Sequence, residues 1–117
     1  MISLLVDESY AYDYLSILRV KALKNGSEGT ISNFMHCSNN IKMQVGSKLH
    51  SEILDSIEYK NLLEANKETF EAVDKAKDDK VKASLIDNLN YKRYLCKQDL
   101  QKKFFQSKQT EIKIGYN

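Results

Sequence analysis

SKLHSEILDSIEYKNLLEANKETFEAVDKAKDDKVKASLIDNLNYKRYLCKQDLQKKFFQSKQTEIKI is the stretch Ser47–Ile114, and it decides the fold of this chain. It contains neither glycine nor proline, and the whole chain has four glycines and no proline. In a helix interior, glycine costs about 1 kcal/mol and proline about 3 kcal/mol. Their joint absence over more than half of the chain therefore predicts long helices.

Apolar residues in this stretch recur every three or four positions, which is the period of one face of an α-helix. The spacing predicts one helix over Glu58–Asp78 and another over Lys80–Phe105. A turn is expected between them at residues 78–80, where two aspartates precede a lysine.

The N-terminal part is expected to add a helix over residues 7–24. Asp7–Ser9 supply capping oxygens and negative charge at the positive end of the helix dipole. Asn25 and Gly26 follow as a stop signal. The apolar face predicted for this helix holds Tyr10, Ala11, Tyr14, Leu15, Ile17, Leu18 and Ala22.

Residues 27–40 are rich in serine, asparagine, glycine and threonine, and their pattern does not decide whether they are helical. After them, the spacing predicts a helix that begins near Asn40, or only at Ser47 because Gly46 interrupts it.

The two ends of the chain have short patterns of a different kind. Ile2–Val6 is apolar and partly β-branched, and Glu111–Tyr116 alternates apolar and polar residues with the period of a strand. We therefore expect a mainly α fold, an antiparallel bundle of three or four helices, in a single helical domain over residues 1–117. The extended ends are expected to form a small two-stranded β element, within one subunit or between two.

Composition excludes several classes of protein. The net charge of +2 is too small to indicate a nucleic-acid binder by itself, and nine acidic against four basic residues over 52–79 are followed by nine basic against three acidic over 80–117. No apolar run is long enough to span a bilayer, and Met1–Val6 lacks the basic leader of a signal peptide. Two distant cysteines do not make a secreted disulfide framework. We expect a soluble cytoplasmic protein.

Two carboxylate pairs form the strongest candidate for a metal site. Glu52 with Asp55, and Glu71 with Asp74, are each spaced three apart and so lie on one side of a helix. Facing each other, they would offer oxygen ligands to a divalent cation, as in the all-α nucleotide pyrophosphohydrolases. Lysines interleave with these acids, however, which is typical of a solvated helix face. We expect an ordinary surface in preference to a metal site, and no cofactor.

Histidine and cysteine have no spacing that coordinates zinc. His36 and Cys37 are adjacent, His50 is isolated, and Cys96 lies on an apolar helix face, where a free cysteine behaves as a small hydrophobe.

Two polar residues interrupt the apolar faces. Asn66 lies among Leu62, Phe70 and Val73, and Arg93 lies on the main face of the last predicted helix. A buried polar group without a partner costs about 1–3 kcal/mol, so each is expected to find one. A structural network that sets the packing of the helices is favoured, with a small ligand in the core as the alternative.

The helix over Lys80–Phe105 has a second apolar side, and exposed aromatic residues are common at interfaces. We expect a homo-oligomer, a dimer or higher, that is held together there. Lysines around this side leave a weak single-strand nucleic-acid binder as a less favoured alternative. The expected interface residues are Tyr91, Tyr94, Leu95 and Phe105, and the lysines are Lys97, Lys102, Lys103 and Lys108.

Three segments carry a family resemblance: Asp13-Tyr-Leu-Ser-Ile-Leu-Arg-Val-Lys21, Asn66-Lys-Glu-Thr-Phe-Glu-Ala-Val-Asp-Lys-Ala-Lys77 and Glu111-Ile-Lys-Ile-Gly-Tyr116. Each is similar to a segment of a family of small, uncharacterised bacterial and phage helical proteins, in the same order. That family's patterns are Asp-x-Leu-Ser/Thr-Ile-Leu-x-x-Lys, Asn-x-x-Leu-Trp-Glu-x-Glu-Asp-Lys-Ile-Arg and Glu-x-Lys-Ser-Tyr. Here Thr69-Phe70 stands for Leu-Trp, and Arg93 and Lys97 match an arginine-rich helix only in part.

The resemblance implies a helical domain of unassigned function, with genes often near those for surface polysaccharides, and it implies no catalytic residues. It draws attention to Asp13, Lys21, Asn66 and Asp74. The residues and the resemblance together predict a small self-associating accessory or binding protein that is not an enzyme. The alternatives are the metal-dependent phosphohydrolase and the nucleic-acid binder described above.

Overall fold

The computed structural model describes residues 2, 5–76 and 83–114, and within them it is built from helices. The predicted turn at residues 78–80 lies outside the described residues. The mainly α prediction is confirmed. The helices are α1 (Glu8–Asn25), α2 (Glu28–Val45), α3 (Ser47–Asp55), α4 (Ile57–Ala76) and α5 (Ala83–Ile114).

The predicted β element is not confirmed. Strands are absent from the described residues, and residues 111–114 continue α5. A period-two pattern of four residues is outweighed here by the helix before it, which offers each new residue an i→i−4 hydrogen bond.

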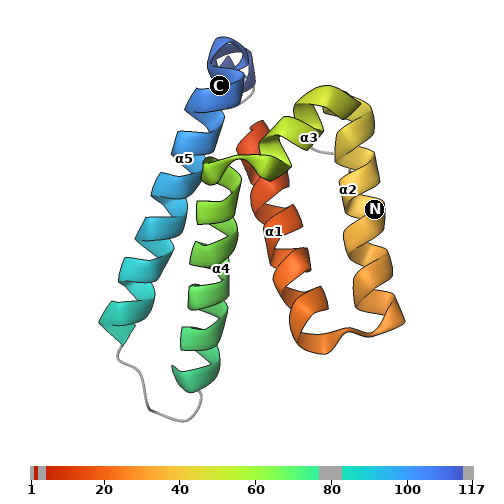
Figure 1. Ribbon diagram of the computed structural model, residues 1–117. Helices are drawn as coiled ribbons and strands as arrows, with labels where there is room; N and C mark the ends of the chain where they lie inside the picture. The colour runs from red at the N-terminus through yellow and green to blue at the C-terminus, as the bar shows by residue number, and fades with distance from the viewer. Residues whose placement is uncertain (1, 3–4, 77–82, 115–117) are drawn as a thin grey trace.

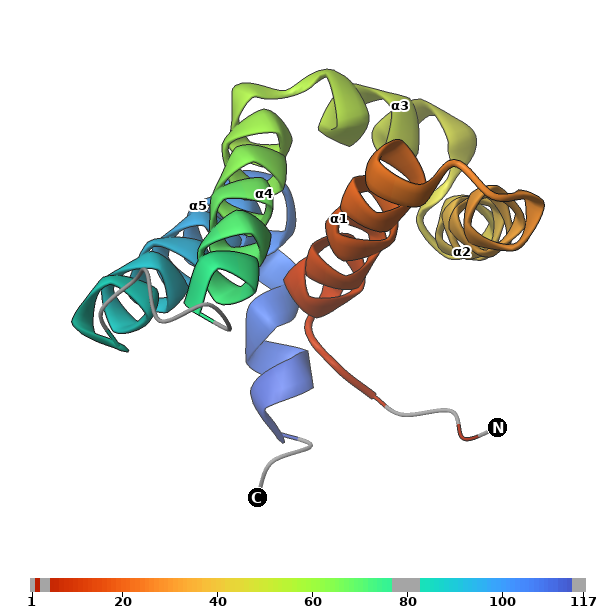
Figure 2. The same ribbon diagram turned by 90° about the horizontal axis from the view of Figure 1, so that it is seen from below.

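The helices are arranged around α1. In Figure 1, α4 and α5 run side by side in opposite directions, α1 lies beside α4, and α3 crosses one end of the molecule between α2 and α4. Figure 2 shows α1 between α2 and the α4–α5 pair. Because α1 has neighbours on more than one side, it buries more than a single stripe.

This arrangement corrects the predicted face of α1. Tyr10 and Tyr14 are exposed, whereas Tyr12 is fully buried. Tyr12 contacts elements from across the chain, with its ring 6.2 Å from that of Tyr59 and 6.5 Å from that of Phe105. The core cluster comprises Tyr12, Leu15, Ile41, Ile53, Tyr59, Leu62, Leu100 and Phe105.

Local sequence explains the helix boundaries. Gly26, at φ 63°, ends α1 in the left-handed conformation that glycine adopts without a steric penalty, and its N–H donates to the Ala22 carbonyl. The Ser27 hydroxyl then accepts the Thr30 N–H at the start of α2. Ser56 separates α3 from α4, and its hydroxyl accepts the Tyr59 N–H at 3.1 Å.

Residues 27–40, undecided from the sequence, are helical as part of α2. Only Ile41 is buried among the residues of α2. Phe34 packs against the core cluster, and the Arg19 guanidinium of α1 lies 5.3 Å from the centre of its ring. Tertiary contact with α1 therefore stabilises a helix that its composition alone does not predict.

Candidate functional site

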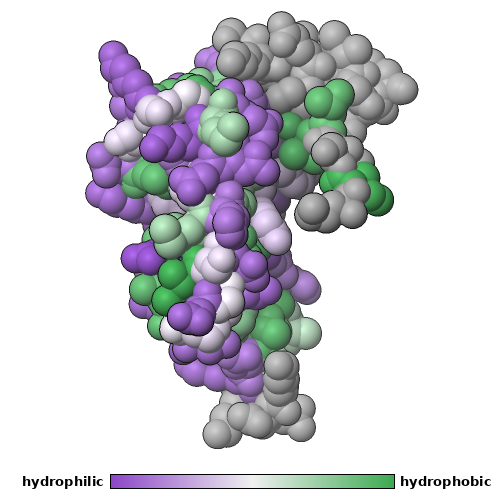
Figure 3. Space-filling view, turned by 90° about the vertical axis from the view of Figure 1, so that its right-hand side faces the viewer, coloured by the Kyte–Doolittle hydropathy of each residue, from purple (hydrophilic) through white to green (hydrophobic). Residues whose placement is uncertain are grey.

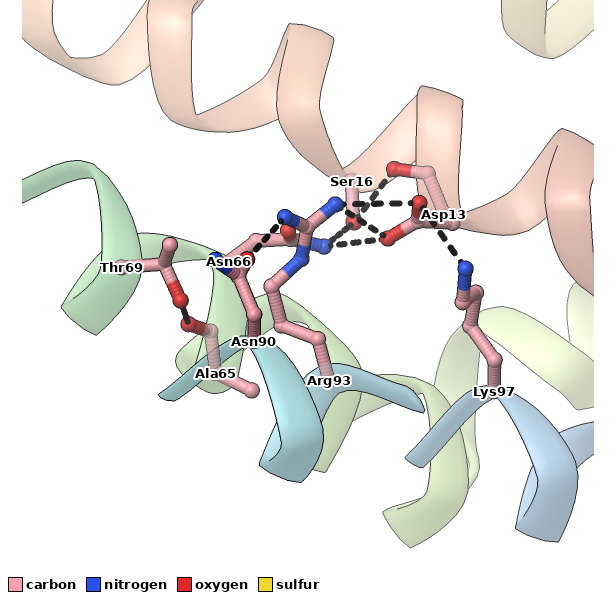
Figure 4. Close-up of polar contacts among 8 residues, drawn as sticks. All are labelled: Asp13, Ser16, Ala65, Asn66, Thr69, Asn90, Arg93 and Lys97. Atoms are coloured by element: carbon pink, nitrogen blue, oxygen red, sulfur yellow. Dashed lines mark hydrogen bonds and ion pairs between the residues drawn. The ribbon is translucent and has the colours of Figure 1, made fainter. Parts of the chain in front are cut away.

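A polar network joins α1, α4 and α5 (Figure 4). Asn66 of α4 donates from Nδ2 to Asp13 Oδ1 at 2.8 Å and to Ser16 Oγ at 2.6 Å, both on α1. Arg93 of α5 donates from Nη2 to Asp13 Oδ2 at 3.2 Å, and Lys97 Nζ lies 3.9 Å from the same oxygen. We call Asp13, Ser16, Asn66, Arg93 and Lys97 the inner polar network.

Helix periodicity brings these side chains together. Asp13 and Ser16 are three apart on α1, and Arg93 and Lys97 are four apart on α5, so each pair shares one side of its helix. The Ser16 hydroxyl also donates to the Asp13 backbone carbonyl at 2.7 Å. The Asp13 carboxylate therefore lies where α1 meets both α4 and α5.

The inner polar network is buried, so the charge of Asp13 needs compensation by its partners. Asp13 is 8% exposed and Asn66 is 4% exposed. An ionised carboxylate at this depth is costly unless cations and hydrogen-bond donors compensate for lost water. Two cations and an amide do so here. The chemistry fits a device that fixes how three helices pack, since the carboxylate lies on α1, the amide on α4 and both cations on α5.

Asp13, Asn66 and Arg93 form the centre of the inner polar network, and the sequence indicated two of them, Asn66 and Arg93. Asn66 and Arg93 interrupt apolar faces, and each was expected to find a polar partner. Asp13 reads as an ordinary surface charge in the sequence, and only the family resemblance drew attention to it. The sequence also held a weak signal for Asp13, because Ser9 and Ser16 flank it at helical spacing and form a polar stripe. In the structure all three residues are buried.

An apolar groove of about 310 Å³ lies beside the inner polar network. Its wall includes Arg93, whose Nε is buried and has no hydrogen-bond partner among the described residues. The groove is large enough for a small, mostly apolar molecule with one hydrogen-bond acceptor. It is lined by Ile17, Val20, Asn66, Thr69, Phe70, Val73, Asp74 and Arg93.

His50 of α3 belongs to a second buried polar set, which joins it to α1 and α2. Its Nδ1 is 2.8 Å from the Tyr12 hydroxyl and its Nε2 is 3.0 Å from the Ser38 hydroxyl. Burial, with the charge of Lys42 nearby, lowers the pKa of His50 below 6.5. Burial also raises the pKa of Tyr59 to about 12. These groups are therefore neutral at pH 7.

The two cysteines are free and half-buried. Burial raises the pKa of both the Cys37 and the Cys96 thiols. A thiol in that state is a poor nucleophile, because the thiolate is the reactive form.

The two carboxylate pairs lie apart from each other. Glu52 and Asp55 are exposed on α3, whereas Glu71 and Asp74 are exposed in the second half of α4. At 1.5 Å per residue, Glu71 lies roughly 20 Å along α4 from its start, where α3 ends. Within the part of the chain that the structure describes, no three histidine, cysteine, aspartate or glutamate side chains come close enough to hold a metal ion.

The side of α5 that faces away from the core carries exposed aromatic residues. Successive residues of an α-helix are about 100° apart around its axis. At this spacing, six residues of α5 share one side of the helix. Tyr91, Tyr94 and Leu95 are 62%, 49% and 42% exposed. The rings of Tyr91 and Tyr94 stack at 6.1 Å, and Gln98 Nε2 donates to the Tyr94 hydroxyl at 2.6 Å. We call this set the outer face of α5: Asp87, Tyr91, Tyr94, Leu95, Gln98 and Lys102.

Phe105 was predicted to belong to this interface, and that prediction is wrong. Phe105 is 1% exposed and packs against Tyr12. The backbone of α5 leaves helical geometry at Phe105, with φ −132° and ψ 17°, and the end of α5 lies next to the start of α1 (Figure 2). Phe105 follows Lys97 and Gln101 at four-residue spacing, and all three lie on the side of α5 that contacts α1.

Gln101, unremarked in the sequence, also lies where α5 meets the start of α1. It is 2% exposed, and its Oε1 accepts the Ser9 N–H at 2.8 Å. Its Nε2 donates to Glu8 Oε1 at 3.1 Å. A side chain of α5 thus caps α1, which no local pattern around residues 7–9 reveals.

The lysines near the outer face are not equivalent. Lys97 makes contacts within its own subunit: its Nζ lies 3.9 Å from Asp13 Oδ2 and 4.5 Å from the centre of the Tyr10 ring. Lys102 and Lys103 are exposed. The side chain of Lys108 lies outside the described residues. The basic surface predicted around the aromatic residues is therefore reduced by one cation. Lys21, indicated by the resemblance, is exposed on α1.

The opposite side of the molecule, where α2 lies, is mainly hydrophilic with separate hydrophobic patches (Figure 3). Exposed apolar residues of α2 are Ile31, Met35 and Met43. They include no aromatic ring, in contrast to the outer face of α5.

Comparison with known proteins found no match to this chain among protein-family models, curated proteins or solved structures. In the described part of the chain, every helix is too short or too polar to cross a membrane.

Proposed function

We propose that this chain is a small helical binding protein that self-associates through the outer face of α5 and does not act as an enzyme. One observation carries the proposal: Tyr91, Tyr94 and Leu95 stay exposed on one side of α5, whereas Phe105 of the same helix is buried. Adjacent exposed aromatic residues are costly on a lone monomer and are enriched at interfaces.

Order within this surface supports the same reading. The Tyr91 and Tyr94 rings stack on each other, and Gln98 holds the Tyr94 hydroxyl. Side chains that are already ordered lose less conformational entropy when a partner binds. On the neighbouring helix, Tyr10 is exposed and lines a small hollow with Tyr94, which extends the aromatic surface onto α1.

Light scattering coupled to size-exclusion chromatography tests the proposal. The wild-type protein is expected to show more than one subunit, and Tyr94→Glu combined with Leu95→Glu is expected to give a monomer with unchanged helix content. Met35→Glu on α2 is the matched control, because Met35 is 55% exposed and lies away from α5. A monomeric wild type from micromolar to millimolar concentration contradicts the proposal.

The phosphohydrolase alternative draws less support from the geometry. Its four acids lie in two separate, exposed places. Magnesium or manganese would have to raise the melting temperature of the wild type and leave that of Glu71→Ala unchanged. Nucleic-acid binding, the third option, would show as an affinity that falls steeply with salt.

A cytoplasmic location is also part of the proposal. It suits the two free thiols of Cys37 and Cys96, which are half-buried and whose pKa is raised by burial.

A further inference from the structure

The outer face of α5 carries opposite charges at equal distances from its centre. Tyr94 and Leu95 stand at its centre. Asp87 lies two turns before this centre, and Lys102 lies two turns after it on the same side of the helix. Both are exposed. The face therefore has an apolar middle, an acid at one end and a base at the other.

A second copy of the same helix complements this face only in one direction. In an antiparallel pair with two-fold symmetry, residues whose numbers add to 189 face each other: 94 with 95, 91 with 98, and 87 with 102. Asp87 of each copy then meets Lys102 of the other, twice per dimer. In a parallel pair each residue meets its own copy, which opposes aspartate to aspartate and lysine to lysine.

The charged residues next to the outer face do not compete with the pairing of Asp87 and Lys102. Lys92 is paired with Glu68 of α4 at 3.2 Å, and Arg93 is paired with Asp13 of α1. Lys92 lies at the surface between α4 and α5, Arg93 points to the interior, and both already have partners. Within the described residues, neither Asp87 nor Lys102 forms an ion pair, and they are the charges that the outer face presents to a partner.

We propose that two copies of this chain form a two-fold dimer in which their α5 helices pair antiparallel, centred on Tyr94 and Leu95, with Asp87 of each copy bound to Lys102 of the other. The inference rests on the proposed function and adds the partner, the direction and the register. It gives the interface the usual organisation, an apolar centre with a polar rim.

A charge-exchange experiment tests the pairing. Asp87→Lys alone places two lysine pairs in the dimer, and Lys102→Asp alone places two aspartate pairs there. Each variant by itself is expected to dimerise about tenfold more weakly or worse than the wild type, as measured by analytical ultracentrifugation. An equimolar mixture of the two variants restores opposite charges at both positions, and it is expected to form a heterodimer close to wild-type affinity. The double exchange, Asp87→Lys with Lys102→Asp in one chain, is expected to restore the homodimer.

Disulfide trapping tests the direction. In a Cys37→Ser, Cys96→Ala background, one chain carries Asp87→Cys and a second chain, with a different affinity tag, carries Lys102→Cys. Oxidation of the mixture is expected to give mainly the 87–102 heterodimer. Dominant 87–87 and 102–102 products would overturn the antiparallel register. Circular dichroism of each variant checks that helix content is retained.

The outcomes separate the two proposals. A monomeric wild type overturns self-association itself. A dimeric wild type that ignores the charge reversals, or whose mixture fails to form the heterodimer, overturns only the register and leaves self-association standing.

Discussion

The two sides of α5 both depart in part from the usual rule for a surface helix. Toward the interior, Arg93 and Lys97 carry positive charge to the buried carboxylate of Asp13. Toward the outside, Tyr91 and Tyr94 expose aromatic rings. A soluble helix normally buries its apolar side and exposes its charges. On α5, charges accompany the core residues Leu100 and Phe105 on the inner side, and aromatic rings lie on the outer side, where we propose that a partner binds.

The energetic consequences of the two sides also differ. An ion pair in a partly dry interior is costly to break, because the remaining charge is left without a partner. An exposed aromatic residue contributes little to the stability of the monomer, and its energy appears only when a second molecule covers it. Mutations on the inner side should therefore change stability, and those on the outer side should change association.

The largest effect is expected from Asp13→Ala. It removes the acceptor of Asn66 and the counter-charge of Arg93, so the free energy of unfolding should fall by about 3 kcal/mol. Urea denaturation monitored by circular dichroism measures this. Glu68→Ala is the matched control, because Glu68 pairs with Lys92, the residue next to Arg93, at the surface. That loss should be about 0.5 kcal/mol or less. Equal losses for the two variants would contradict the distinction between the sides.

The second buried polar set, His50 with Tyr12 and Ser38, is expected to make an intermediate contribution to the free energy of unfolding. His50→Leu leaves the hydroxyls of Tyr12 and Ser38 without this partner and should cost about 1–2 kcal/mol at neutral pH. Because the folded-state pKa of His50 lies below the unfolded value of 6.5, the unfolded state binds the proton more readily. Wild-type stability should therefore be full above pH 6.5 and fall as the pH drops below it.

Denaturation curves at pH 7.5 and pH 5 measure this pH dependence. It should be smaller in His50→Leu than in the wild type. His36→Gln, at an exposed histidine of α2, should retain the wild-type behaviour. A pH dependence that is unchanged in His50→Leu would assign it to other groups.

Lys97→Met refines the account of the inner polar network. The substitution keeps most of the apolar stem and removes the more distant of the two cations near Asp13, at 3.9 Å. A loss of about 0.5–1 kcal/mol is expected, well below that of Asp13→Ala. If thermal or chemical denaturation shows a loss as large as that of Asp13→Ala, then Lys97 and not Arg93 is the main counter-charge.

The smallest effect on stability is expected from Tyr91→Ser on the outer side. In dilute solution, where the monomer dominates, the free energy of unfolding should change by about 0.5 kcal/mol or less. At high concentration the same variant should associate more weakly than the wild type, as sedimentation velocity would show. A large loss of monomer stability would mean that Tyr91 packs within its own subunit.

The sequence was most informative where structure is local. The helices over Glu58–Asp78 and residues 7–24 correspond closely to α4 and α1, because helix-forming residues and end signals act within a few positions. Asn66 also stood out, since an amide among apolar neighbours requires a partner. Residues 27–40 gave no such signal, and they are helical because α1 packs against them.

The sequence was least informative where two distant elements meet. Nothing near Phe105 predicts a kink, since glycine and proline are both absent there, and its burial depends on Tyr12 at the other end of the chain. Gln101 capping α1 is a contact of the same kind. Such contacts depend on packing that becomes defined only when the helices assemble.

The amino-acid sequence by itself determined that the chain is helical, where its clearest helices lie, and that Asn66 and Arg93 need polar partners. Only the tertiary structure decided that Asp13 is the partner they share and that Phe105 faces inward while Tyr91 and Tyr94 face outward. The physical reason is range. Helical hydrogen bonds join residues four apart, whereas the contacts of Asp13 with Asn66 and Arg93 join residues 53 and 80 positions apart.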